Sequence, residues 1–142
     1  MMKKEIVKAH CDGPCGVYDP ASARIAAEAV VSMTKKMLDL KAPEGSENMG
    51  HYVNTMSRYA SIKEQEAQKC KDDILVLWTD FFKPEHLESH DDLHDLFWNT
   101  AKLCSACKVE LSLDHANDLL AHVKKIHDLF WSVKGRKVDW YT

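Results

Sequence analysis

A histidine and two cysteines lie close together near the start of the chain, in the segment His10-Cys11-Asp12-Gly13-Pro14-Cys15. If the chain is cut before His10, the new terminal amine and the amide nitrogen of Cys11 can close a chelate ring on a metal ion. The same amide nitrogen and the Cys11 thiolate close a second ring, and the turn between the cysteines brings the Cys15 thiolate to a fourth position. Two nitrogen and two sulfur donors in one plane suit nickel or copper(II) rather than tetrahedral zinc, and the His10 imidazole can bind on the axis.

The spacing of the two cysteines is by itself a weak signal. A Cys-x-x-x-Cys pair in a loop also suits a zinc site or a redox site, so these alternatives stay open at this point. Ionised amide and thiolate donors release electron density, and they therefore stabilise a higher oxidation state of a bound metal. We call residues 10–18 the hook.

The hook needs a free amine at His10, which divides the chain into an expected pro-peptide, residues 1–9, and one domain, residues 10–142. The leader carries three lysines but lacks the apolar segment of a secretory signal. We therefore expect a pro-peptide that is removed in the cytoplasm. The alternative is an N-terminus that stays on the chain.

Length and composition limit the classes of protein that the chain can belong to. The 142 residues are 45% hydrophobic and 29% charged, as in a soluble protein with one core. The 19 basic and 22 acidic residues give a net charge of −3, which disfavours nucleic acid or an anionic membrane as a partner. No apolar run approaches the roughly 20 residues that span a bilayer. The odd number of cysteines, 5, favours thiols or metal ligands over a disulfide framework.

Apolar residues recur at spacings of three and four along the chain after the hook, which predicts helices. The four predicted helices span residues 20–40, 46–81, 91–108 and 112–134. No stretch alternates with period two for long enough to form a strand. Short links between amphipathic helices predict an all-α protein, an antiparallel up-and-down four-helix bundle with the metal-binding hook at its N-terminus.

Local signals set the expected helix ends. An Asp-Pro pair is a favourable start for the first helix, and Ser46 and Ser112 are the predicted caps of the second and the fourth. The pair Lys83-Pro84 is expected to stop the second helix, and Gly135 the fourth.

The segment from His10 to Arg24, HCDGPCGVYDPASAR, resembles the mature N-terminus of the nickel superoxide dismutase family. The match recurs at residues 63–65 (KEQ), 77–84 (LWTDFFKP) and 130–131 (FW), so it covers most of the chain after the leader. The resemblance implies an enzyme that disproportionates superoxide by cycling between Ni(III) and Ni(II). It also implies a homohexamer with one nickel ion per subunit, and a dedicated peptidase that cuts before the histidine.

The same resemblance assigns the site residues. The nickel ligands are expected to be the amine and imidazole of His10, the amide and thiolate of Cys11, and the thiolate of Cys15. Tyr18 matches the tyrosine that screens the open face of the metal, and it completes the expected catalytic set. Two further residues match those that support the hook and its approach, Asp12 and Lys83.

The chain departs from the family pattern at two places. Members often have a glutamate on the first helix, backed by an arginine on the second, that hydrogen-bonds the axial imidazole; these positions read Ala26 and Glu66 here. We hypothesise that Glu66 orients His10 instead, because a carboxylate beside a ligand histidine fixes its tautomer. The second departure is Phe81, where some relatives carry a tyrosine near the site.

Three cysteines outside the hook are weaker candidates. Cys104 and Cys107 form a Cys-x-x-Cys pair on the third predicted helix, and Cys70 lies on the second. A metal or redox role is one interpretation. We favour buried core residues, because unpaired cysteines are among the most buried residue types.

Six histidines outside the hook are further candidates. His86, His90 and His94 recur at every fourth position, a spacing that can bind zinc on one helical face. A helix break expected among them favours a solvated face instead. The other three are expected at the surface or at helix ends: His115, His122 and His127.

Two functions compete with dismutation. A nickel or copper carrier would use the same hook to bind metal and hand it on, and a purely structural bundle would keep its leader and never form the hook.

Loss of the leader removes three lysines and one glutamate, so the net charge of the mature chain is more negative by two. Any attraction of an anionic substrate must then come from local lysines such as Lys83.

Overall fold

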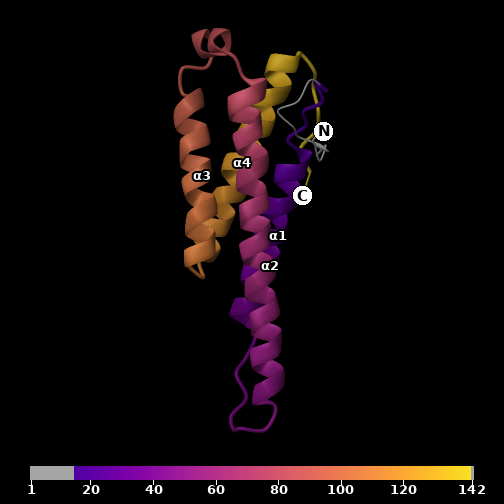
Figure 1. Cartoon of the computed structure of the whole chain (residues 1–142), viewed down its shortest axis with the longest axis vertical. Helices are drawn as coiled ribbons and strands as arrows, with labels where there is room; N and C mark the ends of the chain where they lie inside the picture. Colours follow the sequence, from indigo (N-terminus) through magenta and orange to yellow (C-terminus); the bar gives the residue numbers. More distant parts are fainter. Residues whose placement is uncertain (1–14, 142) are drawn as a thin grey trace, which may run out of the picture.

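The structure is a computed structural model that describes residues 15–141 (Figure 1). Within this range the chain is helical and forms no strand. Its elements are four α-helices, a π-helical turn η1 and a 3-10 helix η2: α1 Ala21–Asp39, α2 Met49–Val76, η1 Leu77–Phe81, η2 Pro84–Glu88, α3 Leu93–Val109 and α4 Leu113–Lys134.

The four α-helices run along the long axis of the molecule. α1 packs on α2 and α4, and α3 packs on the same two helices, so that successive helices are neighbours. The predicted antiparallel up-and-down four-helix bundle is therefore confirmed. None of the helices in the described range is long and apolar enough to cross a membrane.

Small side chains let α1 approach its neighbours closely. Ala23, Ala26 and Ala27 have no exposed surface, and their size brings the helix axes together. Ser22 Oγ donates a 2.6 Å hydrogen bond to Asp73 Oδ2 on α2, which fixes the register of these two antiparallel helices. Larger, fully buried side chains from α2, α3, α4 and η1 fill the rest of the core: Ile74, Leu77, Leu93, Phe97, Leu119, Ile126 and Phe130.

Of the five predicted helix ends, four are confirmed and one is wrong. α1 begins at Ala21, directly after the Asp-Pro pair. Ser112 Oγ accepts a 3.2 Å hydrogen bond from the His115 N–H, and Gly135 ends α4 with a φ of 68°. Lys83 follows the last helical turn of the second predicted helix, as expected. Ser46 is not a cap, because α2 begins only at Met49, after an asparagine whose φ is 63°. Asparagine tolerates this left-handed conformation, and here it moves the helix start three residues along the chain.

The second predicted helix changes its winding before it stops. Residues 77–81 form the π-helical turn η1, in which the Phe82 N–H donates a 3.1 Å hydrogen bond to the Leu77 carbonyl. Single π-helical turns inside α-helices are frequent at functional sites. The wider turn contains Phe81, whose ring centroid lies 4.4 Å from that of Phe130 on α4.

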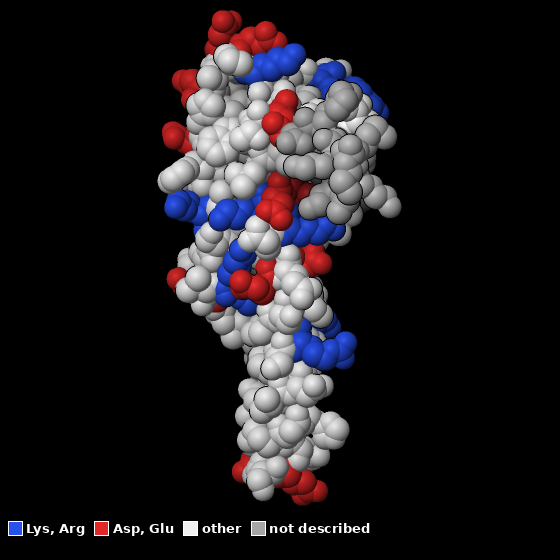
Figure 2. Space-filling view, viewed as in Figure 1, with Lys and Arg blue, Asp and Glu red and all other residues white. Residues whose placement is uncertain are grey.

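The α1–α2 hairpin extends past the ends of α3 and α4 (Figure 1). We call residues 35–62 the α1–α2 arm; none of its residues is buried. It exposes several large apolar side chains: Leu38, Met49, Val53 and Ile62. Figure 2 shows few charged side chains on the visible face of the arm, apart from acidic ones at its tip.

Residues 136–141, the C-terminal strap, fold back along the bundle after Gly135. The His127 Nε2 atom lies 2.9 Å from the Val138 carbonyl, and the Trp140 ring lies 5.3 Å from the His127 ring. The Arg24 guanidinium of α1 stacks on the Tyr141 ring at 5.1 Å. The expectation that His127 lies at the surface is therefore wrong: the strap covers it, and only 6% of it is exposed.

Candidate metal centre

The described part of the hook is its second half, which leads into α1. His10, Cys11 and Asp12, which the sequence predicts as ligands and support, lie outside the described residues. Cys15 is exposed, and the next residue is a glycine with a φ of 67°, a conformation that larger residues rarely adopt. The half-buried Tyr18 packs its ring 5.6 Å from the Phe81 ring, which anchors the end of the hook on η1.

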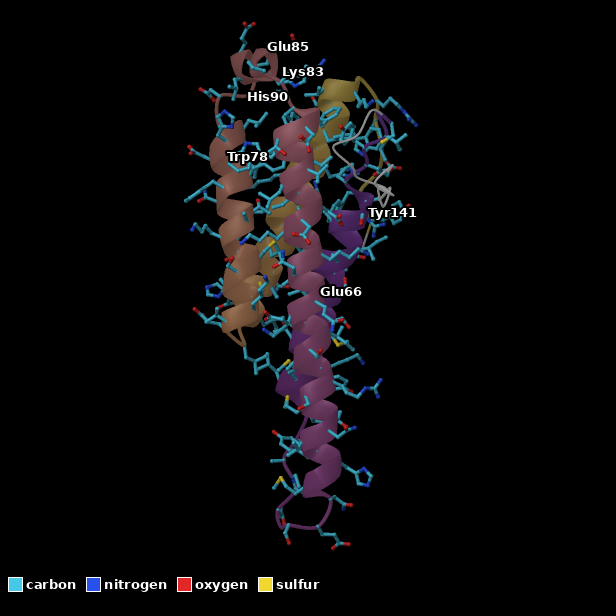
Figure 3. All side chains as sticks on the ribbon, viewed as in Figure 1. Glu66, Trp78, Lys83, Glu85, His90 and Tyr141 are labelled. Carbon is cyan, nitrogen blue, oxygen red and sulfur yellow. The ribbon has the colours of Figure 1, made fainter. Side chains whose placement is uncertain are left out.

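A hollow of 340 Å³ opens beside Tyr18. The end of the hook, η1, the link from η1 into η2 and the end of α4 together form its walls. We call it the Tyr18 hollow; it is lined by Gly16, Tyr18, Asp80, Phe81, Lys83, His86, Val133 and Lys134. The structure thus brings two of the predicted site residues, Tyr18 and Lys83, to one place. Figure 3 shows Lys83 at the start of η2, close to Glu85 within it.

The charges around the Tyr18 hollow differ in sign from the net charge of the chain. Lys83 and Lys134 contribute two positive charges and Asp80 one negative charge, whereas the whole chain carries −3. The Lys134 Nζ atom lies 5.6 Å from the centre of the Phe81 ring, a cation–π contact that holds this ammonium at the hollow. The hollow is therefore suited to a small anion.

Glu66 lies away from the Tyr18 hollow. It is partly buried on α2, and Figure 3 shows it midway along the molecule, well below the turn with Lys83. The Ser22–Asp73 hydrogen bond gives the register of the two helices. Ala26 is one turn from Ser22, and Glu66 is two turns from Asp73, so the two departures from the family pattern lie about one turn, roughly 5 Å, apart along the helix axes.

Three charged or polar residues that line the hollow were not predicted at this site: Asp80, His86 and Lys134. Asp80 and Lys134 look like ordinary surface charges on helical stripes, and no local pattern brings them together. The sequence could have placed His86 in a turn near Lys83, because it follows the pair Lys83-Pro84, where a helix has to end. The Lys83 N–H donates a 3.0 Å hydrogen bond to His86 Nδ1 across that turn.

The three histidines spaced four apart do not share one face. His86 belongs to η2 and the Tyr18 hollow, while His90 lines a separate groove beside α4. His94 lies on α3, where its Nδ1 accepts a 2.8 Å hydrogen bond from Trp78 Nε1. The expected helix break among them is confirmed, and so they do not form a zinc site together.

Cys70, Cys104 and Cys107 are buried, as predicted. The hydrogen bond with Cys104, together with burial, raises the pKa of the Cys70 thiol well above its ordinary value. Burial likewise raises the pKa of Cys107 to about 11. Because metals bind the thiolate, these thiols are poor ligands, and the exposed Cys15 is the better one. Among residues 15–141 no group of three or more His, Cys, Asp or Glu side chains can hold a metal ion.

The fold and the site define a small helical-bundle protein whose first helix is preceded by an exposed cysteine next to a cationic hollow. Comparison with known proteins identifies the family. The model for "Nickel-containing superoxide dismutase" matches residues 5–134, so the chain belongs to this family. The chain is therefore an oxidoreductase whose cofactor is nickel.

Known relatives match over nearly the full chain. "Superoxide dismutase [Ni]" of Streptomyces coelicolor is 40% identical over 131 residues, 92% of either chain. The protein of the same description from Streptomyces seoulensis is 39% identical over 128 residues, 90% of either chain. The native 1.30 Å structure of nickel superoxide dismutase superposes with a TM-score of 0.76 at 38% identity, and it covers 89% of this chain and 100% of its own.

Proposed function

We propose that the hook of this chain holds one nickel ion and that superoxide is disproportionated there to dioxygen and hydrogen peroxide. The observation that carries the proposal is the position of Cys15. It is the exposed cysteine of the described range, and it directly precedes the residues that line a cationic hollow. Its chain belongs to the nickel-containing superoxide dismutase family.

The proposed ligands are the amine and imidazole of His10, the amide and thiolate of Cys11, and the thiolate of Cys15. Solved relatives support the place of His10 in this assignment, and of Asp12 and Tyr18 beside it, through the residues that were varied in them. They include variants of a histidine at the first residue, of an aspartate two residues later and of a tyrosine eight residues after the histidine. His10, Asp12 and Tyr18 have the same spacing in this chain.

A nickel ion held by His10, Cys11 and Cys15 would supply a one-electron redox couple, which is the chemistry that disproportionation of superoxide requires. The side chains around it control access. Tyr18, held against Phe81, screens the open face of the hook, and Asp12 supports the hook. Lys83 attracts the anionic substrate at short range, where the net charge of the chain does not help. A narrow approach also protects the thiolates, which hydrogen peroxide oxidises.

The proposed site requires removal of residues 1–9. Only a chain that begins at His10 offers a primary amine at the position of the first ligand. We propose that a dedicated peptidase makes this cut in the cytoplasm, because the basic leader lacks the apolar segment of a secretory signal. Residues 10–142 then form the mature domain.

Glu66 is proposed to orient the imidazole of His10, one of the proposed nickel ligands. It takes the place where members of the family often have an arginine, while Ala26, about one turn away, replaces their glutamate. A carboxylate that accepts the other N–H of a ligand imidazole fixes its tautomer and raises its basicity. We expect Glu66→Gln to change both the dismutation rate and the nickel absorption spectrum. An unchanged rate and spectrum would remove Glu66 from the site, and Glu64→Gln, an exposed carboxylate on the same helix, is the control.

We further propose that the protein is a homohexamer, as the family resemblance implies. The support from this chain is the α1–α2 arm, which holds no buried residue and exposes apolar side chains such as Leu38 and Val53. A monomer gains little from such a surface in water, whereas other copies of the chain can cover it.

The test is superoxide dismutation by protein that begins at His10, measured with and without stoichiometric nickel. We expect activity only with nickel, and its loss in Cys11→Ser and in Cys15→Ser. Cys70→Ala is the matched control, since it removes a thiol that is buried in the core. Activity that persists without nickel, or in both hook variants, would contradict the proposal.

The same experiment separates the enzyme from a metal carrier. Tight nickel binding by the mature chain without turnover would support the carrier, and it would make Ala26 and Glu66 the first positions to restore. A chain that keeps residues 1–9 and binds no nickel, although its maturation peptidase is present, would support a structural bundle.

A further inference from the structure

His86 is held in one ring orientation and one tautomer. Its Nδ1 accepts a 3.0 Å hydrogen bond from the Lys83 N–H. A neutral imidazole that accepts at Nδ1 carries its proton on Nε2. Among residues 15–141 the ring makes no other hydrogen bond that engages Nε2, and His86 lines the Tyr18 hollow. The Nε2–H can therefore donate a hydrogen bond to a ligand in the hollow.

Two phenylalanines hold the imidazole ring in place. The Phe81 ring stacks on it at 6.2 Å with an interplanar angle of 20°, and the Phe82 ring meets it edge-on at 5.7 Å. Phe81 also contacts the Tyr18 ring, at 5.6 Å. Phe81, which has no hydroxyl, thus packs against two polar donors that line one hollow, the Tyr18 phenol and the His86 imidazole.

The groups that face His86 favour a negatively charged occupant. Lys83 and Lys134 line the same hollow and outnumber the single carboxylate, Asp80. Two ammonium groups attract an anion without fixing its orientation, because their side chains are long and flexible. The N–H of a ring that is held by one hydrogen bond and two ring contacts is directional, and its hydrogen bond to an anion is charge-assisted.

We propose that His86 Nε2–H is the hydrogen-bond donor of a binding subsite for small monoanions in the Tyr18 hollow, and that this subsite holds superoxide before it reaches the hook. The inference rests on the proposed function for the identity of the anion only. His86 keeps its proton in this role, so it is a positioning residue and no bond is made or broken at it.

The first test uses the full chain without nickel. Long-range ¹H–¹⁵N spectra of the histidine rings report which nitrogen of His86 carries the proton. We expect a protonated Nε2, and a saturable shift of this group and of the Lys83 amide when sodium azide, a small monoanion, is added. A proton on Nδ1, or a shift that never saturates, overturns the proposal.

Substitutions then separate the hydrogen bond from the fold. Asparagine and aspartate can both accept the Lys83 N–H through a side-chain oxygen, so His86→Asn and His86→Asp are expected to melt close to the parent. Aspartate lacks a donor and repels anions, so the azide affinity of His86→Asp should fall about tenfold or more. His86→Asn keeps an N–H donor and should retain most of the affinity.

Two controls complete the test. His86→Leu removes the donor without adding charge, and it should lose the azide response as well. His90→Asn, in the separate groove beside α4, should leave it unchanged. Unchanged azide binding in His86→Asp and His86→Leu would overturn the proposal.

The design distinguishes this inference from the proposed function. If the nickel-loaded enzyme dismutates superoxide but the chain without nickel shows no saturable azide response at His86, the subsite is disproved and the function stands. If azide binds as expected but no dismutation occurs with nickel, the subsite stands and the identity of its anion as superoxide is disproved.

Discussion

Lys63 on α2 shows how one residue connects two helices. Only 4% of this lysine is exposed, and its ammonium donates hydrogen bonds to the carbonyls of Cys107, Lys108 and Glu110. These carbonyls lie at the C-terminal end of α3, where a helix lacks internal partners and where a cation is favourable. The buried charge is therefore stabilised by backbone dipoles rather than by a carboxylate.

We expect Lys63→Met to destabilise the bundle. Methionine keeps most of the aliphatic length but leaves the carbonyls at the end of α3 without their donor, which should lower the free energy of unfolding by about 2 kcal/mol. Urea unfolding followed by circular dichroism measures the change. Lys69→Met, an exposed lysine on the same helix, is the control, and equal stability of the two variants would show that the Lys63 bonds add nothing.

Cys107 predicts a loss of stability at alkaline pH. Burial raises the pKa of this thiol in the folded chain from 9.0 to about 11. Between these values the unfolded chain releases the thiol proton and the folded chain keeps it, so the free energy of unfolding falls as the pH rises. The stability that the protonated Cys107 thiol contributes is fully present below pH 9 and is lost as the pH approaches 11.

The measurement is the unfolding midpoint in urea at several pH values from 8 to 11, for the parent and for Cys107→Ala. Tyrosines and lysines titrate in both proteins, so the difference between the two curves isolates the thiol. We expect the parent to lose more stability than the variant across this window. Parallel curves would mean that the folded chain ionises Cys107 as readily as the unfolded chain does.

At the scale of the helices, the sequence predicted those features that depend on residues close together in the chain. Ser112 and Gly135 define their helix ends through bonds within a few residues, and the apolar spacing defines the helices between such ends. Ser46 fails because the left-handed conformation of Asn48 moves the start of α2. The π-helical turn η1 was not predicted, since it changes the winding without changing the apolar pattern.

The residues of the candidate site likewise divide into those that a local motif predicts and those that only the fold brings together. Cys15, Tyr18 and Lys83 were predicted, because the hook motif contains the first two and the family-like segment LWTDFFKP contains the third. His86 and Lys134 were not, because only the tertiary fold brings η2 and the end of α4 to the same hollow. Sequence spacing gives no information about side chains that meet through the fold.

The C-terminal strap is an element that lies beyond the family match, which ends at residue 134. It covers His127 and contacts α1 through Arg24 and Tyr141. We expect a chain that stops after Lys134 to lose about 1–3 kcal/mol of folding free energy, because it exposes apolar surface and leaves His127 without its backbone partner.

Thermal unfolding of the shortened chain measures this loss. Dismutation with nickel should remain, since the family match ends at residue 134, before the strap. Tyr141→Leu is the narrower variant, because it removes the stacking on Arg24 and keeps the rest of the strap. A shortened chain with the stability of the parent would show that the strap packs without stabilising the bundle.

At the scale of the whole molecule, the α1–α2 arm has no core of its own. Two antiparallel helices bury only the surface between them, and no residue of the arm is buried even there. Yet Leu38 and Val53 on this arm are about half exposed, and apolar side chains repeated along one long element indicate a surface that another protein covers. In the proposed homohexamer that protein is another copy of the chain.

The arm therefore predicts how the assembly can be broken. Charges at its centre, Leu38→Glu combined with Val53→Glu, should dissociate the hexamer into smaller species, because a carboxylate buried without a partner opposes association. Sedimentation velocity measures the assembly, and circular dichroism shows whether the helices persist. Trp98→Glu places the same charge on the exposed face of α3, outside the arm, and should leave the assembly intact. If the double variant stays hexameric while Trp98→Glu dissociates, the subunits meet through α3, and the exposed apolar side chains of the arm need another explanation.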